Sequence, residues 1–333
     1  MSKAGKKPVS IVIPTWNGRE LLERFLPSVV RSLEAWPGGG EIVVVDDGGA
    51  DDTPAWLAEH YPRVRLLRLE RNGGFAGAVN RCVAAAVHEV VILLNNDVEV
   101  EVDFIAPLAG WFGRRQDVFA VCARSLDWDR KTFRDGGKLG RWQRGFWRVW
   151  QNYDVNPAAR AEDSPLLSIY CPGGFSAFDR SRWLALGGLD ELFAPFNWED
   201  TDICYRAWKR GWLALYEPAS TIYHRPNTTI GGGAFRAGYV RFISRRNRLF
   251  FHWKNLTDRR MLARHLLALL LSLPLSLLRL DFPSLAALAT ALAAAGRIRQ
   301  RRKRELAESK VSDREIWETF HRFLGVPNLE IKP

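Results

Sequence analysis

The stretch VILLNNDVEV (residues 91–100) joins an unbroken apolar run to a polar triplet, Asn95, Asn96 and Asp97. A run of β-branched and leucine residues without alternation is typical of a parallel strand that is covered on both faces. The triplet then lies at the carboxyl edge of a sheet, where the ligands of open α/β folds bind. The stretch therefore predicts a buried parallel sheet with a ligand site at one end.

The sequence around this stretch alternates predicted strands and helices. Strands are predicted at 9–14, 41–46, 64–69 and 118–124, and helices at 19–36, 53–61 and 74–88. This order requires right-handed crossovers in a mostly parallel sheet with helices on both faces. We therefore expect a Rossmann-like α/β fold.

Each of the first strands ends in a polar or glycine-rich segment. The segments are PTWNG (14–18), DDGG (46–49), RNGGFAGAVN (71–80) and the NND triplet. A glycine-rich turn before a helix lets backbone N–H groups approach an anion at the helix N-terminus. Four such strand ends in succession favour a binding site, because a purely structural sheet needs only one or two capping residues.

The regular pattern weakens after the strand at 118–124. Residues 126–154 are rich in Trp, Arg and Gly, and their apolar residues follow neither the helical period of about 3.6 nor the strand period of two. We therefore predict a long, partly ordered loop. Two short strands are predicted later, at 212–216 and 220–224.

Composition limits the class of protein. With 333 residues, 47% hydrophobic and 26% charged, the chain is globular. Its four cysteines are scattered without a CxxC pair, which argues against a zinc ribbon or a disulfide framework and fits a reducing compartment. The N-terminus MSKAGKKPVS lacks the apolar core of a signal peptide, so none is expected.

Taken together, the motifs IVIPTWNG, VVVDDGG, NGGFAGAVN, LLNNDVEV, GGLDELF and WEDTDICYRAWKRGW resemble the inverting family 2 glycosyltransferases of the GT-A fold, in particular their rhamnosyltransferase-like branch. The resemblance covers about residues 9–225 and implies a catalytic domain over 1–234, with a nucleotide-sugar half at about 9–125 and an acceptor half at about 165–234. It implies that a nucleotide diphosphate sugar lies across the strand ends. The residues implied near its base and ribose are Pro14, Thr15, Asn17, Asp46 and Asp47, and those near its diphosphate are Asn72, Gly73, Gly74, Gly77 and Asn80.

The NND triplet takes the place of the family's DxD motif, which holds a divalent metal on the donor diphosphate. Asn95 departs from that motif, so Asp97 is the charged ligand expected for Mg²⁺ or Mn²⁺, and Asn95 and Asn96 suit sugar or ribose hydroxyls. One aspartate suffices in principle, because these ions keep water and phosphate ligands. His224 matches a position that contacts the metal or the diphosphate, and Arg225 could neutralise the leaving diphosphate. The alternative is that the triplet is only a turn.

The segment NWEDTD (197–202) puts three acids at the start of a predicted helix. The helix dipole favours acids there, so capping explains one or two of them. The resemblance implies that Asp200 is the catalytic base, and Asp202 is expected to be structural.

The acceptor side is expected at Gly173, Gly174, Trp198 and Glu199. The two glycines could equally form a β-bulge, and Trp198 could equally belong to the core. Trp183 is expected to be a core residue.

The C-terminal segment 235–333 differs in character from the rest of the chain. Between Arg236 and Lys310 it has 17 Lys and Arg against four acids, a balance of +13 in a chain of net charge +11. Arginines alternate with aromatic residues over 235–255, and apolar runs of 13 and 11 residues follow at 266–278 and 285–295. Each run is shorter than the about 20 residues that span a bilayer.

We expect this segment to form a monotopic helical hairpin on anionic lipid at the cytoplasmic face of the cell membrane. The alternatives are a helical pair packed on the catalytic domain and a kinked transmembrane passage over 262–295. Single-stranded nucleic acid is an unlikely partner, because the apolar runs favour lipid.

These features predict an inverting, metal-assisted transfer from a nucleotide diphosphate sugar to a hydroxyl of a lipid-linked or growing glycan acceptor, as in cell wall or polysaccharide biosynthesis. The resemblance suggests dTDP-rhamnose as the donor. Two alternatives stay open: a polyprenyl-phosphate sugar transferase, and a non-catalytic membrane module that binds nucleotide sugars or glycans.

Overall fold

The computed structural model describes residues 6–155, 165–224, 236–325 and 329–332. Its centre is a mixed sheet in the order β10-β12-β6-β11-β4-β1-β2-β3, with β5 paired to β12 and β7 paired to β6. The strands β1 to β4 run parallel to one another, as do β6 and β12, whereas β11 is antiparallel to β4 and β6, β10 and β5 are antiparallel to β12, and β7 is antiparallel to β6. The predicted α/β fold with a mostly parallel sheet is confirmed. The strands are β1 (Val9–Thr15), β2 (Gly40–Asp46), β3 (Arg65–Arg68), β4 (Val90–Leu94), β5 (Val98–Val100), β6 (Val118–Leu126), β7 (Phe133–Asp135), β10 (Leu166–Leu167), β11 (Phe175–Asp179) and β12 (Leu213–His224).

Helices cover both faces of this sheet, because its central strands are apolar on both sides. In β1, Ile11 and Ile13 face the core under α1 and α4, whereas Val12 faces the core under α3 and α6. The five residues of β4 are all buried, as the opening run predicts. The helices of this part are α1 (Arg19–Ala35), α2 (Thr53–His60), α3 (Gly74–Ala85), α4 (Ile105–Arg114), α5 (Arg180–Leu186), the 3₁₀ turn η2 (Glu191–Phe193) and α6 (Glu199–Lys209).

The prediction of a loop over 126–154 is wrong. This segment contains β7 and then a hairpin of β8 (Gly137–Gln143) and β9 (Phe146–Asp154), which β13 (Glu330–Ile331) extends into a second sheet. Trp147, Val149 and Tyr153 are buried, and the exposed Trp150 with the half-buried Gln151 and Asn152 between them obscures the strand period. Arg144 and Gly145 form the two-residue turn with φ of 51° and 79°, which the right-handed twist of a hairpin favours.

The two short strands predicted at 212–216 and 220–224 form one strand, β12. Its pairing with β6 shifts register between Glu217 and Thr221. That irregularity contains Pro218, which lacks the N–H that a regular ladder uses.

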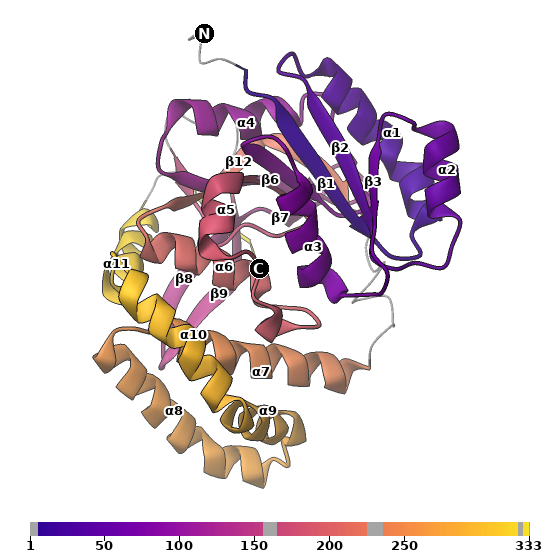
Figure 1. The fold of residues 1–333 in the computed structure, drawn as a ribbon. Helices are drawn as coiled ribbons and strands as arrows, with labels where there is room; N and C mark the ends of the chain where they lie inside the picture. Colours follow the sequence, from indigo (N-terminus) through magenta and orange to yellow (C-terminus); the bar gives the residue numbers. More distant parts are fainter. Residues whose placement is uncertain (1–5, 156–164, 225–235, 326–328, 333) are drawn as a thin grey trace.

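The C-terminal helices pack on the catalytic part and on one another. They are α7 (Ala237–Asn255), α8 (Arg259–Leu278), α9 (Phe282–Ala293), α10 (Ala295–Glu308) and α11 (Asp313–Phe323). In Figure 1, α7, α8, α9 and α10 form a layer below the sheet, and β8 and β9 extend toward it.

Buried ion pairs fasten α10 and α11 to α6. Lys209 pairs with Asp313 at 2.9 Å and Arg210 with Glu305 at 2.5 Å. Apolar residues on both sides of residue 235 belong to one buried cluster, so the change in composition at 235 is not a break in the core.

The helix α8 is different, because most of it faces outward. Over an 18-residue window of this 20-residue helix the mean hydropathy is 1.8, and only 11% of the window is buried. By length and composition this helix could cross a membrane. The apolar run at 266–278 is too short to do so, but the whole helix is longer than that run.

Candidate active site

The carboxyl edge of β1, β2 and β4 brings the predicted donor-side residues together. The Asn96 amide donates to Thr15 Oγ1 at 2.9 Å, which joins the NND triplet to the end of β1. Asn17 has a φ of 48°, and its side-chain oxygen accepts from the Ala50 N–H at 2.7 Å. The polar ends of β1, β2 and β4 thus form one rim, as the motif spacing predicts.

The two aspartates after β2 hold the backbone around this rim. Asp46 is fully buried, and it accepts from the Gly49 N–H at 2.8 Å. Asp47 accepts from the N–H groups of Gly73 and Gly74 at 2.8 and 3.0 Å, so its carboxylate fixes the turn before α3. Contact of Asp46 and Asp47 with a nucleotide stays a prediction, and their observed role is to shape the loops.

Residues of the NGGFAGAVN motif have distinct surroundings. Asn72 accepts from the Gly74 N–H, and Gly74 has a φ of 76°, which favours glycine there. A side chain at Gly77 would face the Glu191 carboxylate at 3.8 Å. The Asn80 amide donates to the Leu189 carbonyl and accepts from the Leu189 N–H, both at 2.8 Å, so it fastens the segment after α5 to α3.

Asp97 and His224 form the candidate metal pair. The register of β5 against β12 sets Val98 opposite His224, so His224 Nε2 lies 3.4 Å from Asp97 Oδ1. Asp97 is 3% exposed, and His224 Nδ1 is buried without a hydrogen-bond partner among the residues that the structure describes. Neighbouring ligands at right angles on an octahedral ion, each about 2.1 Å away, lie about 3.0 Å apart, so the pair fits two ligands of one divalent cation.

Within the described residues no cluster of three His, Cys, Asp or Glu side chains is arranged to hold a metal. A cation at Asp97 and His224 would therefore depend on phosphate and water for its other ligands. Arg225, expected beside the diphosphate, lies outside the described residues.

The acidic pair Glu199 and Asp200 begins α6. Asp200 Oδ1 accepts from the Thr201 N–H at 2.6 Å. Burial raises the pKa of Asp200 to about 6, while the Thr201 hydrogen bond and the Lys138 ammonium oppose that rise. Burial, together with the Asp200 charge, raises the pKa of Glu199 to about 8. At neutral pH the pair therefore has one carboxylate, Asp200, and one neutral carboxyl, Glu199, which is suitable for a base beside a hydrogen-bond donor.

The backbone just before this pair is strained. Asn197 and Trp198 have φ of 71° and 78°, which is unusual for residues other than glycine. The Asn247 amide of α7 donates to the carbonyls of Phe196 and Asn197, both at 2.9 Å, and holds this segment in place.

Asp202 is structural, as expected. It is fully buried and forms ion pairs with Arg206 at 2.7 Å and Lys254 at 2.8 Å. The Asn255 amide donates to its other oxygen.

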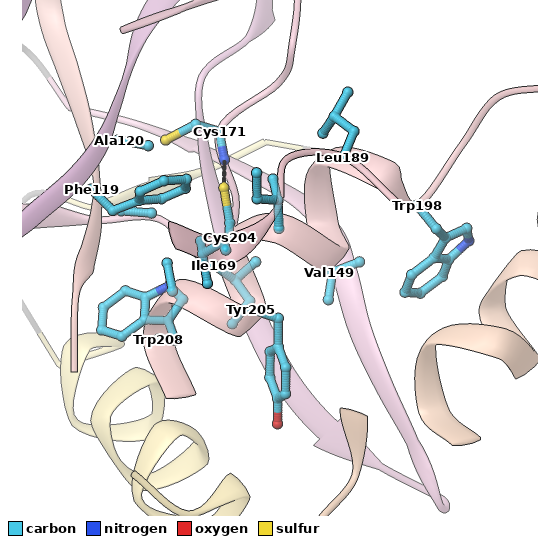
Figure 2. Close-up of a cluster of buried hydrophobic side chains, with 14 of the residues drawn as sticks. Phe119, Ala120, Val149, Ile169, Cys171, Leu189, Trp198, Cys204, Tyr205 and Trp208 are labelled. Atoms are coloured by element: carbon cyan, nitrogen blue, oxygen red, sulfur yellow. Dashed lines mark hydrogen bonds between the residues drawn. The ribbon is translucent and has the colours of Figure 1, made fainter. Parts of the chain in front are cut away.

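Trp198 belongs to the core. Its side chain is 8% exposed, and its ring lies 5.1 Å from Phe251 and 6.1 Å from His252. Figure 2 shows the indole pointing toward the neighbouring helix, away from Cys171 and Cys204. The burial of this ring favours the core alternative for Trp198, and its contact with an acceptor stays a prediction. Trp183 is 1% exposed and is core, as expected.

Gly174 lies against the NND triplet. The Asn95 N–H donates to the Gly174 carbonyl at 2.8 Å, and a Cβ on Gly174 would lie 2.5 Å from the Asn95 amide nitrogen. A Cβ on Gly173 would touch the Phe75 ring at 3.4 Å. The close approach of the Asn95 amide explains Gly174, whereas Gly173 has room for a Cβ. Contact of either glycine with an acceptor stays a prediction.

Sequence reasoning missed two charged groups that act on Asp200. Lys138 and Asp135 come from the segment predicted as a loop, and their charges lower and raise the pKa of Asp200, respectively. The signal that could have located them was the burial of Trp147, Val149 and Tyr153 in β9, whose alternation the exposed Trp150 obscures.

Comparison with known proteins identifies the class. The sequence profile of glycosyl transferase family 2 matches residues 10–181. The chain belongs to glycosyl transferase family 2. It is 28% identical over 239 residues to an N-acetylglucosaminyl-diphospho-decaprenol L-rhamnosyltransferase of Mycobacterium tuberculosis, covering 66% of this chain and 76% of the relative. It is 29% identical to polypeptide N-acetylgalactosaminyltransferase 10 of Mus musculus, covering 65% of this chain and 37% of that protein.

Two solved structures share the fold. One is GalNAc-T7 with UDP, GalNAc and Mn²⁺, with a TM-score of 0.59 and 21% identity over 77% of this chain and 49% of the other. The second is the mannosyltransferase PcManGT of Pyrobaculum calidifontis with GDP-Man and Mn²⁺, with a TM-score of 0.52 and 19% identity over 97% and 87% of the two chains. The GT-A fold is confirmed, and the protein is a glycosyltransferase that uses a nucleotide-sugar donor. The non-catalytic alternative is therefore not supported.

Proposed function

We propose that this transferase inverts the anomeric centre of its donor sugar and passes the sugar to a hydroxyl of a lipid-linked glycan. The observation that carries the proposal is the acidic pair at the start of α6, where Asp200 has a pKa of about 6 and Glu199 a pKa of about 8. A base that is ionised at neutral pH suits a hydroxyl acceptor. The phosphate acceptor of a polyprenyl-phosphate sugar transferase needs no such base. The acidic pair therefore favours a hydroxyl acceptor over a phosphate acceptor.

In this reaction the residues of the chain have separate tasks. Asp200 takes the proton of the acceptor hydroxyl, and the neutral Glu199 carboxyl donates a hydrogen bond to the acceptor. Thr15, Asn96 and the turn held by Asp47 line the donor side. Asp97 and His224 would hold a divalent cation, Mg²⁺ or Mn²⁺, which stabilises the leaving diphosphate when bound.

We propose a lipid-linked acceptor and a membrane-peripheral location from two observations. The M. tuberculosis relative is named for a diphospho-decaprenol acceptor. Exposed leucines follow one another along α8, among them Leu267, Leu270 and Leu271 at 55%, 62% and 70% exposure. Such a strip is unusual on a protein surface that faces only water. With arginines at both ends, α8 suits the interface of an anionic membrane.

A direct transfer assay tests this function. Purified protein with Mn²⁺ is offered dTDP-rhamnose, UDP-N-acetylglucosamine and GDP-mannose in turn, with N-acetylglucosaminyl-diphospho-farnesol as the acceptor. We expect mass spectrometry to show one added sugar from one donor, and NMR to show the anomeric configuration inverted. An identical yield from Asp200→Asn, or a product that retains configuration, would contradict the proposal.

A further inference from the structure

Three arginines meet where the β8–β9 hairpin faces α7. Arg141 and Arg148 are directly opposite each other on β8 and β9. The Arg248 guanidinium lies 4.3 Å from the centre of the Phe146 ring and 5.5 Å from that of Trp150. Arg148 lies 5.3 Å from the same Trp150 ring, so the three charges and two aromatic rings form one cluster.

This arginine cluster has no acidic counterpart in the described parts of the chain. The Nε atoms of Arg141, Arg148 and Arg248 are all buried without an acceptor. Burial, with a smaller contribution from the Arg148 charge, lowers the pKa of Arg248 to about 10, so the group is still charged at neutral pH. Like charges directly opposite each other destabilise a hairpin. The chain thus keeps three partly buried cations together at a cost to its own stability, which indicates an anionic ligand.

The surroundings of the cluster indicate an anion with a hydrocarbon part. Arg248 and Phe146 also line a cavity of about 160 Å³ between α7, α8 and α9. The rest of its wall includes the apolar side chains of Leu269, Leu273 and Leu288 and the polar ones of Arg245, Ser272, Ser276 and Ser284. A void of this size is large enough for about one six-carbon group. Arginine forks suit phosphate oxygens, and the apolar wall beside them suits a hydrocarbon chain.

The cluster is also linked to the acidic pair. Arg248 is one helical turn from His252, which accepts from the Trp147 N–H at 2.9 Å and packs on Trp198. Trp198 directly precedes Glu199. On β8, Arg141 is three residues from Lys138, whose charge acts on Asp200. The cluster is therefore connected to the start of α6 through His252 and Trp198.

We propose that Arg141, Arg148 and Arg248 bind the diphosphate of a prenyl-diphosphate-linked acceptor, and that the first part of its hydrocarbon chain enters the groove between α7, α8 and α9. This inference rests on the proposed function. The donor diphosphate is a less suitable occupant, because the donor-side residues lie on β1, β2, α3 and β4, whereas the cluster lies on the hairpin and α7.

The experiment measures binding of farnesyl diphosphate by calorimetry, so that no transfer is required. The variants are Arg148→Gln, Arg248→Gln and Arg148→Lys, which keeps the charge and loses the fork. The matched control is Arg144→Gln, which removes an exposed charge from the turn of the same hairpin. Inorganic diphosphate, farnesol, dTDP and phosphatidylglycerol vesicles are measured in parallel.

We expect Arg148→Gln and Arg248→Gln each to weaken farnesyl diphosphate binding about tenfold or more, with Arg144→Gln like the wild type. Arg148→Lys should be intermediate. The affinity for dTDP should be unchanged, and the melting temperature of Arg148→Gln should be equal or higher, because a repulsion is removed. Farnesyl diphosphate should bind more tightly than either farnesol or diphosphate alone.

Several outcomes would overturn the inference. Farnesyl diphosphate affinity equal to wild type in both glutamine variants would show that the cluster does not bind it. An equal loss of dTDP affinity would assign the cluster to the donor, and a loss confined to vesicle binding would assign it to a lipid headgroup. Transfer activity together with arginine-independent farnesyl diphosphate binding would refute this inference alone, whereas arginine-dependent binding without transfer would refute only the proposed function.

Discussion

The pH dependence of the transfer rate is a direct test of Asp200 as the base. With a pKa of about 6, Asp200 is about 90% ionised at pH 7 and about 10% ionised at pH 5. We therefore expect kcat/KM to fall about tenfold between pH 7 and pH 5. Glu199 ionises at about pH 8, so loss of its donated hydrogen bond should lower the rate above that pH.

Two variants separate the limbs of this profile. Asp200→Asn should lower kcat by about two or more orders of magnitude across the range while nucleotide binding stays near wild type. Glu199→Gln should keep the acid limb near pH 6, because Glu199 is already neutral where Asp200 ionises. It should remove the alkaline limb, because the amide stays a donor at every pH.

Stability gives an independent check on the same carboxylate. Its pKa is raised above the unfolded value of 3.8, so the folded state binds the proton more tightly. The stability that the folded state gains from the tighter proton binding at Asp200 is complete below pH 3.8 and is lost as the pH rises through about 6. Asp200→Asn should therefore be more stable than the wild type at pH 7, by at most about 3 kcal/mol.

The assay is steady-state transfer from pH 4.5 to 9.5 in buffers of constant ionic strength, with urea unfolding of each variant at pH 4 and pH 7. An acid limb near pH 8 in the wild type would make Glu199 the base. Asp200→Asn that keeps its rate, or that is destabilised at pH 7, would refute the reasoning about this pair.

Three further predictions concern the metal pair, the core under α6 and the exposed helix. Asp97→Ala should abolish the Mn²⁺-dependent part of nucleotide affinity in calorimetry, and equal metal-independent binding in both proteins would show that the triplet is no metal site. Asp202→Ala should lower the free energy of unfolding by about 3–5 kcal/mol in urea, because Arg206 is left buried without its partner. Replacing Leu270 and Leu271 by Asp should release the protein from phosphatidylglycerol vesicles at low salt without changing its melting temperature, and unchanged sedimentation would contradict a membrane role for α8.

The parallel sheet was predictable because its strands are continuous apolar runs whose ends are marked by glycine and acid. The strands β1 and β4 are short, buried along almost their whole length and followed by a turn, so local sequence and tertiary burial agree. The motifs at the strand ends also predict that Thr15, Asn96 and Asp97 lie on one rim.

The hairpin was not predictable in the same way, because its charge pattern is unusual for a hairpin. Arg141 and Arg148 occupy cross-strand positions where a structural hairpin would have neutral or opposite charges, and Arg144-Gly145 replaces the usual Asn-Gly turn. The wrong prediction for this segment also hid part of the candidate active site. Lys138, whose charge lowers the pKa of Asp200, lies in the segment that was predicted as a loop. The roles of Asp47 and Asn80 were hidden for another reason: their partners are backbone groups, which a sequence pattern does not show.

The C-terminal helices contact the segment that leads into the acidic pair. The Asn247 amide of α7 holds the carbonyls of Phe196 and Asn197, in the strained segment that leads directly into the acidic pair. The next turn of α7 carries His252, which fixes the hairpin, and α8 continues from α7 after a short connection. A membrane that positions α8 would therefore position the hairpin and the start of α6 as well. If the acceptor is lipid-linked and Asp200 is the base, as proposed, the continuous core across residue 235 would let one helix align the two.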